Sequence, residues 1–69
     1  MNWNQLRYVL TIAEEKSITR AAQRLYLTQP SLSLSLKALE EELGTPLFTR
    51  GSDGLEPTYA GSLFCAWAA

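Results

Sequence analysis

The sequence contains no histidine and a single cysteine, Cys65, among its 69 residues. A lone cysteine cannot build a disulfide framework, and without histidine a transition-metal site is improbable. The chain also lacks a phosphate-binding loop and a paired-carboxylate pattern, so the usual acid–base and nucleophile groups of enzymes are missing. We therefore expect no enzyme, no cofactor and no metal, and we expect Cys65 to act as a small, partly buried hydrophobic residue.

Long apolar runs and an excess of one charge are also missing. No segment approaches the roughly 20 apolar residues of a membrane span, and the N-terminus lacks the pattern of a secretory signal, so the cytoplasm is the expected location. The 6 basic and 7 acidic residues leave a formal net charge of −1. Taken alone, this charge argues against a nucleic-acid-binding domain, and few cations imply few phosphate contacts.

The composition that remains is typical of one small globular domain. The apolar fraction is 46%, with charges of both signs, which is typical of a globular and not of a disordered chain. A chain this short buries only about 60% of the surface that it exposes when unfolded. We therefore expect marginal stability and dependence on a partner.

Residues from about 29 to 43 are predicted to form a helix, with residues 28 and 44 as its caps. Leucines at i, i+4, i+7 and i+11 give one apolar face, although a local alternation of leucine and serine is strand-like. The helix is favoured because Thr28 is a good N-cap, Pro30 is tolerated in the first turn, and Gly44 suits the residue after the helix. The leucines of the inward face are Leu32, Leu36, Leu39 and Leu43.

The opposite side of this helix has the character of a DNA recognition helix. Near the N-terminus it carries Pro30, Ser33, Leu34 and Lys37, which the core does not need. Further along, residues 40–42 are all glutamate. A phosphate-lined groove would accept the N-terminal half of the helix and repel its C-terminal half. The helix dipole favours the same orientation, because its positive end is at the N-terminus.

Two shorter helices are predicted before this one. Apolar spacing indicates a first helix over about residues 3–15, and Ser17 can cap a second that runs to about Leu25. The alanine pair at 21–22 would allow another helix to approach closely, although alanine is also simply a good helix former. The following turn fits a helix-turn-helix, while the lengths alone would also allow a generic helical hairpin. The expected inward residues are Trp3, Leu6, Val9, Leu10, Ala13, Ile18, Ala21, Ala22 and Leu25.

Residues 47–57 are predicted to form a β-hairpin wing with an Asp-Gly turn signal, ending at Pro57. Arg50 on this hairpin could be an ordinary solvated cation, but its place beside the recognition helix favours a phosphate contact. Thr58 then caps a last helix that is apolar on nearly every side, as in a buried helix or an interface. Because the sequence stops within this helix, we expect it to be truncated.

Five short motifs follow one another along the chain. They are Ser17-Ile18-Thr19-Arg20-Ala21-Ala22 with Leu25, Thr28-Gln29-Pro30-Ser31-Leu32-Ser33, Leu39-Glu40-x-x-Leu43-Gly44, Leu47-Phe48-x-Arg50 and Thr58-x-Ala60-Gly61. In this order and at this spacing they resemble the N-terminal winged helix-turn-helix of LysR-type transcriptional regulators. Any one motif is weak, but the five together are specific and cover nearly the whole chain.

The resemblance implies a mainly α-helical fold, with a winged helix-turn-helix over residues 1–58 and the start of a linker helix over residues 59–69. It implies a bacterial transcription factor that binds double-stranded promoter DNA as a dimer or tetramer. The linker helix would mediate a homodimer, weak in this truncated form, through Leu63, Phe64 and Trp67. A C-terminal domain, absent from this sequence, would sense a small-molecule co-inducer.

The DNA contacts follow from the resemblance and from the polar face of the helix. Gln29 would read a base edge, the serines of the same segment would contact bases or phosphates, and Arg20, Lys37 and Arg50 would clamp the backbone. The expected DNA-binding residues are Ser17, Thr19, Arg20, Thr28, Gln29, Pro30, Ser31, Ser33, Leu34, Lys37 and Arg50.

Leu34 departs from the family pattern, which often has a long polar residue at this position. An apolar side chain can contact a thymine methyl group but cannot form a bidentate bond to guanine. An alternative function stays open at this stage. The same fold could serve as an interaction module that pairs through its C-terminal helix and has little DNA binding of its own.

Overall fold

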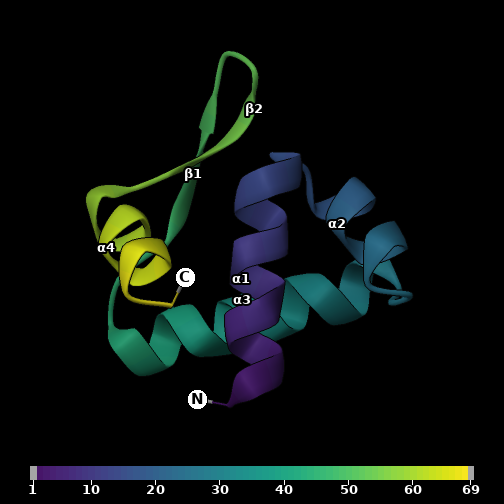
Figure 1. The fold of residues 1–69 in the computed structure, drawn as a ribbon, viewed down its shortest axis with the longest axis horizontal. Helices are drawn as coiled ribbons and strands as arrows, with labels where there is room; N and C mark the ends of the chain where they lie inside the picture. The colour runs from purple at the N-terminus through teal and green to yellow at the C-terminus, as the bar shows by residue number, and fades with distance from the viewer. Residues whose placement is uncertain (1, 69) are drawn as a thin grey trace.

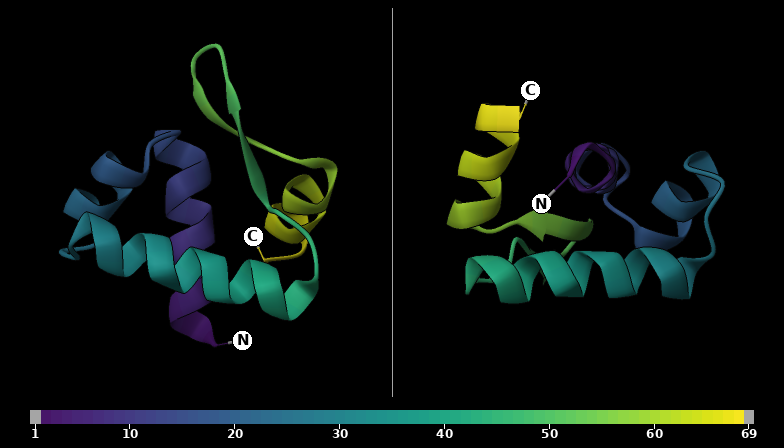
Figure 2. Two further views of the ribbon diagram at one scale, coloured as in Figure 1. Left: turned by 180° about the vertical axis from the view of Figure 1, so that it is seen from behind. Right: turned by 90° about the horizontal axis from the view of Figure 1, so that it is seen from below.

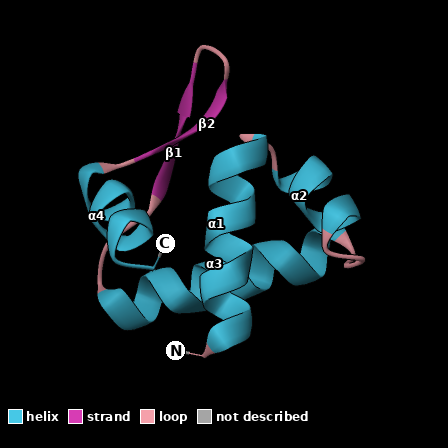
Figure 3. Cartoon of the chain, in the orientation of Figure 1, coloured by secondary structure: helices cyan, strands magenta, loops and turns pink. Residues whose placement is uncertain are grey.

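The computed structural model describes residues 2–68 and shows four helices and one two-stranded antiparallel hairpin over that range (Figure 1). The elements are α1 (Trp3–Glu15), α2 (Ile18–Arg24), α3 (Gln29–Leu43), β1 (Phe48–Gly51), β2 (Gly54–Pro57) and α4 (Tyr59–Ala68). Short loops join them (Figure 3). The predicted winged helix-turn-helix, mainly helical, is thereby confirmed. Within residues 2–68, every helix is too short or too polar to span a bilayer.

Local sequence determines where the helices begin and end. The side-chain oxygens of Ser17, Thr28 and Thr58 each accept a hydrogen bond from the backbone amide three residues later, at 3.0–3.2 Å. Gly44 ends α3 in the left-handed conformation, with φ of 76°. These predicted caps are confirmed because each depends only on neighbouring residues. Asn2 adds a capping box at the start of α1 that the sequence analysis did not predict.

The core lies where α1 crosses α3. In the right-hand view of Figure 2, α1 is seen end-on above α3, with α2 on one side and α4 on the other. Ala21 and Ala22 are fully or almost fully buried, so the alanine pair does serve close helix packing. The buried apolar residues are Val9, Ile12, Ala21, Ala22, Leu32, Leu39, Leu47, Phe48 and Phe64.

Three apolar residues lie differently from the expectation. Trp3 is 84% exposed, because the first turn of α1 projects beyond α3 and has no element to pack against (Figure 1). Leu43, at the last turn of α3, is also exposed instead of completing the inward face. Phe64 is only 9% exposed and belongs to the core, so it does not share one open face with Leu63 and Trp67.

The wing is attached to the connection between α1 and α2. Its strands pair antiparallel with Arg50 opposite Leu55. The amide of Leu55 donates a hydrogen bond of 2.9 Å to the carbonyl oxygen of Lys16. A Cβ on Gly54, whose φ is 117°, would lie 2.5 Å from that same oxygen. Glycine is therefore needed at this turn, and the contact holds the hairpin, with Arg50, beside the start of α2.

Candidate nucleic-acid interface

The N-terminal half of α3 presents a surface that the core does not use. Leu32 and Leu39 point inward with almost no exposure. On the other side, Leu34 is 69% exposed and Lys37 is exposed. The exposed residues around the helix start are Thr28, Gln29, Pro30 and Ser31, and Ser33 is half-buried. The two-sided helix predicted from the leucine spacing is confirmed, apart from the exposed Leu43 in its last turn.

Hydrogen bonds order the polar side chains of this surface. Thr28 Oγ1 accepts from the amide of Ser31 at 3.2 Å and donates to the Ser31 hydroxyl at 2.8 Å. One turn of helix separates Gln29 from Ser33, and Gln29 Nε2 donates to Ser33 Oγ at 3.0 Å. These side chains are thus oriented by each other before any ligand is bound.

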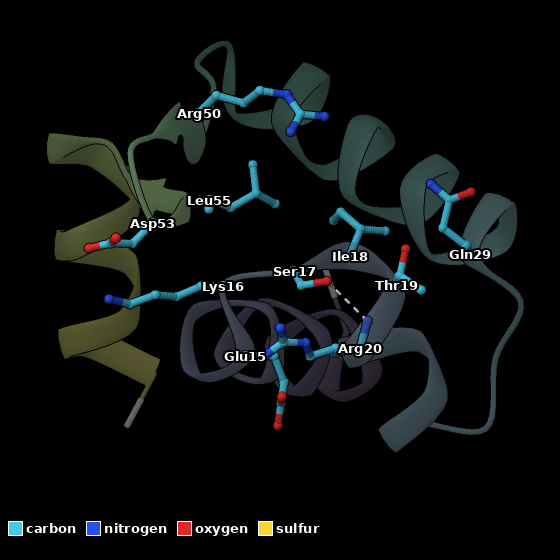
Figure 4. A pocket seen from close by; sticks show the side chains of 11 residues that line it. Glu15, Lys16, Ser17, Ile18, Thr19, Arg20, Gln29, Arg50, Asp53 and Leu55 are labelled. Carbon is cyan, nitrogen blue, oxygen red and sulfur yellow. Dashed lines mark hydrogen bonds between the residues drawn. The ribbon is translucent and has the colours of Figure 1, made fainter.

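A polar cleft of about 390 Å³ lies between the starts of α2 and α3 and the wing. It brings together five residues predicted to bind DNA, namely Ser17, Thr19, Arg20, Gln29 and Arg50. Figure 4 shows Arg20 and Arg50 on opposite sides of the cleft, with Gln29 at one end. The other residues predicted to bind DNA lie on α3 or next to it, outside the cleft. They are Thr28, Pro30, Ser31, Ser33, Leu34 and Lys37.

Lys16 also lines this cleft, and sequence reasoning missed it. The apolar spacing ends the first helix before Ser17, and no function was expected for Lys16. In the structure Lys16 is the C-cap of α1 in the left-handed conformation, with φ of 57°, and its side chain is exposed beside the wing. Asp53 and Glu15 place carboxylates at the same cleft, so its charge is mixed.

The arginines differ in how far their charge is already neutralised. Arg24 forms ion pairs with Glu14 at 2.6 Å and Glu15 at 3.1 Å, and hydrogen bonding to Glu14 followed by Glu15 raises the pKa of Arg24. Within residues 2–68, the structure shows no ion pair for Arg20 or Arg50. Their charges are therefore available to an incoming phosphate, whereas that of Arg24 is engaged.

Glu40 has a structural role that its place in an acidic run did not suggest. Its Oε2 accepts a hydrogen bond of 2.6 Å from the amide of Leu47, and its side chain is half-buried. It therefore joins α3 to the wing. Glu41 and Glu42 are exposed, so they keep the C-terminal end of α3 acidic.

An apolar groove of about 440 Å³ lies at the other end of α3, against α4. Leu43, Leu63 and Trp67 line it with exposed side chains, together with the buried Phe64. The rings of Phe64 and Trp67 meet edge to face, with centroids 6.0 Å apart. Cys65 lies nearby and packs against the core as expected, and burial raises the pKa of its thiol.

Residues 3–62 match the family described as bacterial regulatory helix-turn-helix protein, lysR family. The chain belongs to this family. The LysR-family chain is 50% identical over 64 residues to the HTH-type transcriptional regulator BudR of Klebsiella aerogenes, covering 93% of this chain and 45% of that protein. It is 45% identical to the regulator ClcR of Pseudomonas putida, covering 93% of this chain and 22% of that protein. It thus spans less than half the length of these relatives.

Solved structures of similar fold include DNA-binding domains in complex with DNA. The crystal structure of BenM_DBD in complex with catB site 1 DNA is 43% identical, with a TM-score of 0.92, covering 99% of the LysR-family chain and 76% of that chain. The crystal structure of the CbnR_DBD–DNA complex is 38% identical, with a TM-score of 0.90, covering 99% and 78%. Both the family and the fold expected from the five motifs are confirmed.

Proposed function

We propose that this LysR-family domain binds double-stranded promoter DNA in a sequence-specific manner and regulates transcription in a bacterial cytoplasm, without catalysis. The observation that carries the proposal is the exposed N-terminal half of α3. A helix enters the major groove with its N-terminal residues first. Here that end is exposed and polar, whereas the other end carries Glu41 and Glu42.

The cleft supplies the contacts that would position the domain on the duplex. Phosphate contacts fix the register of a protein on DNA, and base contacts supply the specificity. Arg20 and Arg50 would grip the backbone from the two sides of the cleft, and Lys37 would do so along α3. The hydroxyls of Ser17 and Thr19 at the start of α2 would add uncharged contacts to the DNA backbone.

The relatives support this assignment. BudR and ClcR are named as transcriptional regulators, and BenM_DBD and CbnR_DBD were crystallised with DNA. Because these regulators are more than twice as long as this chain, a response to a small-molecule co-inducer would require a further domain. We assign residues 1–58 to DNA binding and residues 59–69 to the start of a linker helix.

We also propose that two copies associate through α4. Leu63 and Trp67 are exposed beside the apolar groove. A contiguous exposed apolar patch is typical of an interaction site. A two-fold contact would place the same patch on both copies. Over residues 2–68 α4 has 10 residues, and an isolated helix of that length is marginal in water, so we propose a weak contact.

A mobility-shift experiment tests the DNA-binding proposal. A duplex is selected from random DNA with the 69-residue chain, and its affinity is compared with that of a scrambled duplex over a salt series. With three clamping cations, the logarithm of the affinity should fall with log salt at a slope of about −3, because each phosphate contact contributes about −0.9. Arg50→Ala should make this slope shallower by about 1.

Arg7→Ala is the matched control, because Arg7 is exposed on α1 outside the cleft and should leave the slope unchanged. Equal affinity for the selected and scrambled duplexes would contradict the proposal. If the chain then also self-associates, the alternative of an interaction module is the better description.

A further inference from the structure

The hydrogen bond from Gln29 to Ser33 links two residues that face DNA in the proposed function. Its donor is Gln29 Nε2, its acceptor is Ser33 Oγ, and the distance is 3.0 Å. The two residues lie at i and i+4 of α3, so they are neighbours on one face of the helix. Gln29 is exposed at the edge of the cleft, whereas Ser33 is half-buried.

We propose that Ser33 is a positioning residue for Gln29 and that the pair reads one base, with a preference for adenine. The inference rests on the proposed function, since it concerns how the same surface selects its DNA sequence. In this scheme Ser33 makes no base contact of its own. It holds the amide of Gln29 in the orientation in which that amide meets a base edge.

The hydrogen-bonding capacity of the amide supports this scheme. A glutamine amide has one carbonyl oxygen and two N–H donors. One N–H is used by Ser33, which leaves Oε1 and the second N–H of Gln29. One acceptor and one donor are what the N6 amino group and N7 of adenine require in the major groove.

The internal bond also lowers the cost of ordering Gln29. A free glutamine side chain has several rotamers, and fixing it on binding costs entropy. A side chain held in its bound orientation beforehand has less to lose, which increases affinity for the matching base. Gln29 is exposed and has no packing against the core, so the bond to Ser33 is the restraint that the structure provides.

The neighbouring side chains cannot take the same role. Pro30 and Leu34 have no side-chain donor or acceptor. The hydroxyl of Ser31 is bonded to that of Thr28 at 2.8 Å, and Thr28 is occupied as the N-cap of α3. Among the described residues of this surface, Gln29 therefore offers the one side-chain amide, and Ser33 is its partner.

The test measures base preference at each position of a selected duplex for the full chain and its variants. Gln29→Ala should reduce the preference for adenine at one position by about 5- to 150-fold, the range of a lost bidentate contact. Ser33→Ala should reduce the preference at the same position by about 2- to 10-fold, as expected for one lost hydrogen bond. The double variant should equal Gln29→Ala alone, because Ser33 acts only through Gln29.

Two further variants sharpen the test. Ser33→Thr keeps a hydroxyl and should retain the preference. Ser35→Ala, a half-buried serine of the same helix with no bond to Gln29, should leave every position unchanged. Alanine is a good helix former, so the serine-to-alanine variants should stay folded, which circular dichroism verifies.

Loss of preference at a different base pair in Ser33→Ala, additive losses in the double variant, or failure of Ser33→Thr to retain the preference would overturn the inference. Each result would leave the proposed function intact. Absence of any base preference in the parent chain is the distinct result that would reject the proposed function itself.

Discussion

A Cβ atom on Gly61 would clash with the backbone carbonyl oxygen of Leu47. The backbone of α4 at Gly61 therefore packs directly against Leu47, the residue before β1. The amide of Thr58 donates a hydrogen bond of 3.0 Å to the same carbonyl oxygen. Glycine usually weakens a helix. Here it permits a close approach of two backbones, so the position of α4 is set by the domain's own packing.

Gly61→Ala should therefore destabilise the domain, by at least about 1–3 kcal/mol, because the added methyl group meets a backbone atom that has little room to move. Urea unfolding followed by circular dichroism measures the change. Ser62→Ala, at the next and exposed position of α4, is the control and should stay within about 0.5 kcal/mol of the parent. Equal midpoints for both variants would show that α4 does not pack as described.

The two faces of α3 predict opposite outcomes for one substitution. Leu39→Ala should lower the free energy of unfolding by about 2–5 kcal/mol, because Leu39 is buried and its removal leaves a cavity. In a domain this small a loss of that size is enough to abolish folding. Leu34→Ala removes the same atoms from an exposed position and should change stability by less than about 0.5 kcal/mol. Similar thermal melting of both variants would refute the orientation of the helix.

Replacing Tyr26 with asparagine should stabilise the domain. Tyr26 lies in the turn between α2 and α3 with φ of 59°, and its side chain is 96% exposed. A left-handed conformation is unfavourable for tyrosine and tolerated by asparagine, and no packing is lost. Tyr26→Asn should raise the unfolding free energy by about 0.5–1 kcal/mol, measured by urea unfolding. A clear loss of stability would mean that the exposed ring makes contacts that the structure does not show.

Trp67→Glu tests the association through α4. Trp67 is 67% exposed beside the apolar groove, so a charge there would be buried in a pair of copies. Sedimentation over a concentration series should show the dissociation constant raised at least about tenfold. Ala66→Glu adds the same charge at an exposed neighbour outside the groove and should have a smaller effect. A parent chain that stays monomeric at high concentration would refute the association.

Features that depend on neighbouring residues could be predicted from the sequence. The caps at Ser17, Thr28 and Thr58 and the end of α3 at Gly44 were all confirmed, because a cap needs only a suitable side chain at a helix boundary. The bounds of α3 were predicted for the same reason. The exposed position of Leu34 followed from the angular spacing of the leucines.

Features that depend on distant packing could not be predicted. Helical spacing placed Trp3 inward, but whether a first turn is covered depends on the length of the element beneath it. The same limit explains Phe64, which was expected in the dimer contact together with Leu63 and Trp67 and which the core encloses. The bond between Leu55 and Lys16, which places Arg50 at the cleft, joins residues far apart in sequence.

Amide chemical shifts of the chain, measured while the selected duplex is added, test the central claim most directly. If the N-terminal half of α3 enters the major groove, the largest changes should fall on residues 17–20, 28–37 and 50, with small changes at residues 41–44 and in α4. Largest changes at the acidic end of α3 or along α4 would contradict the account.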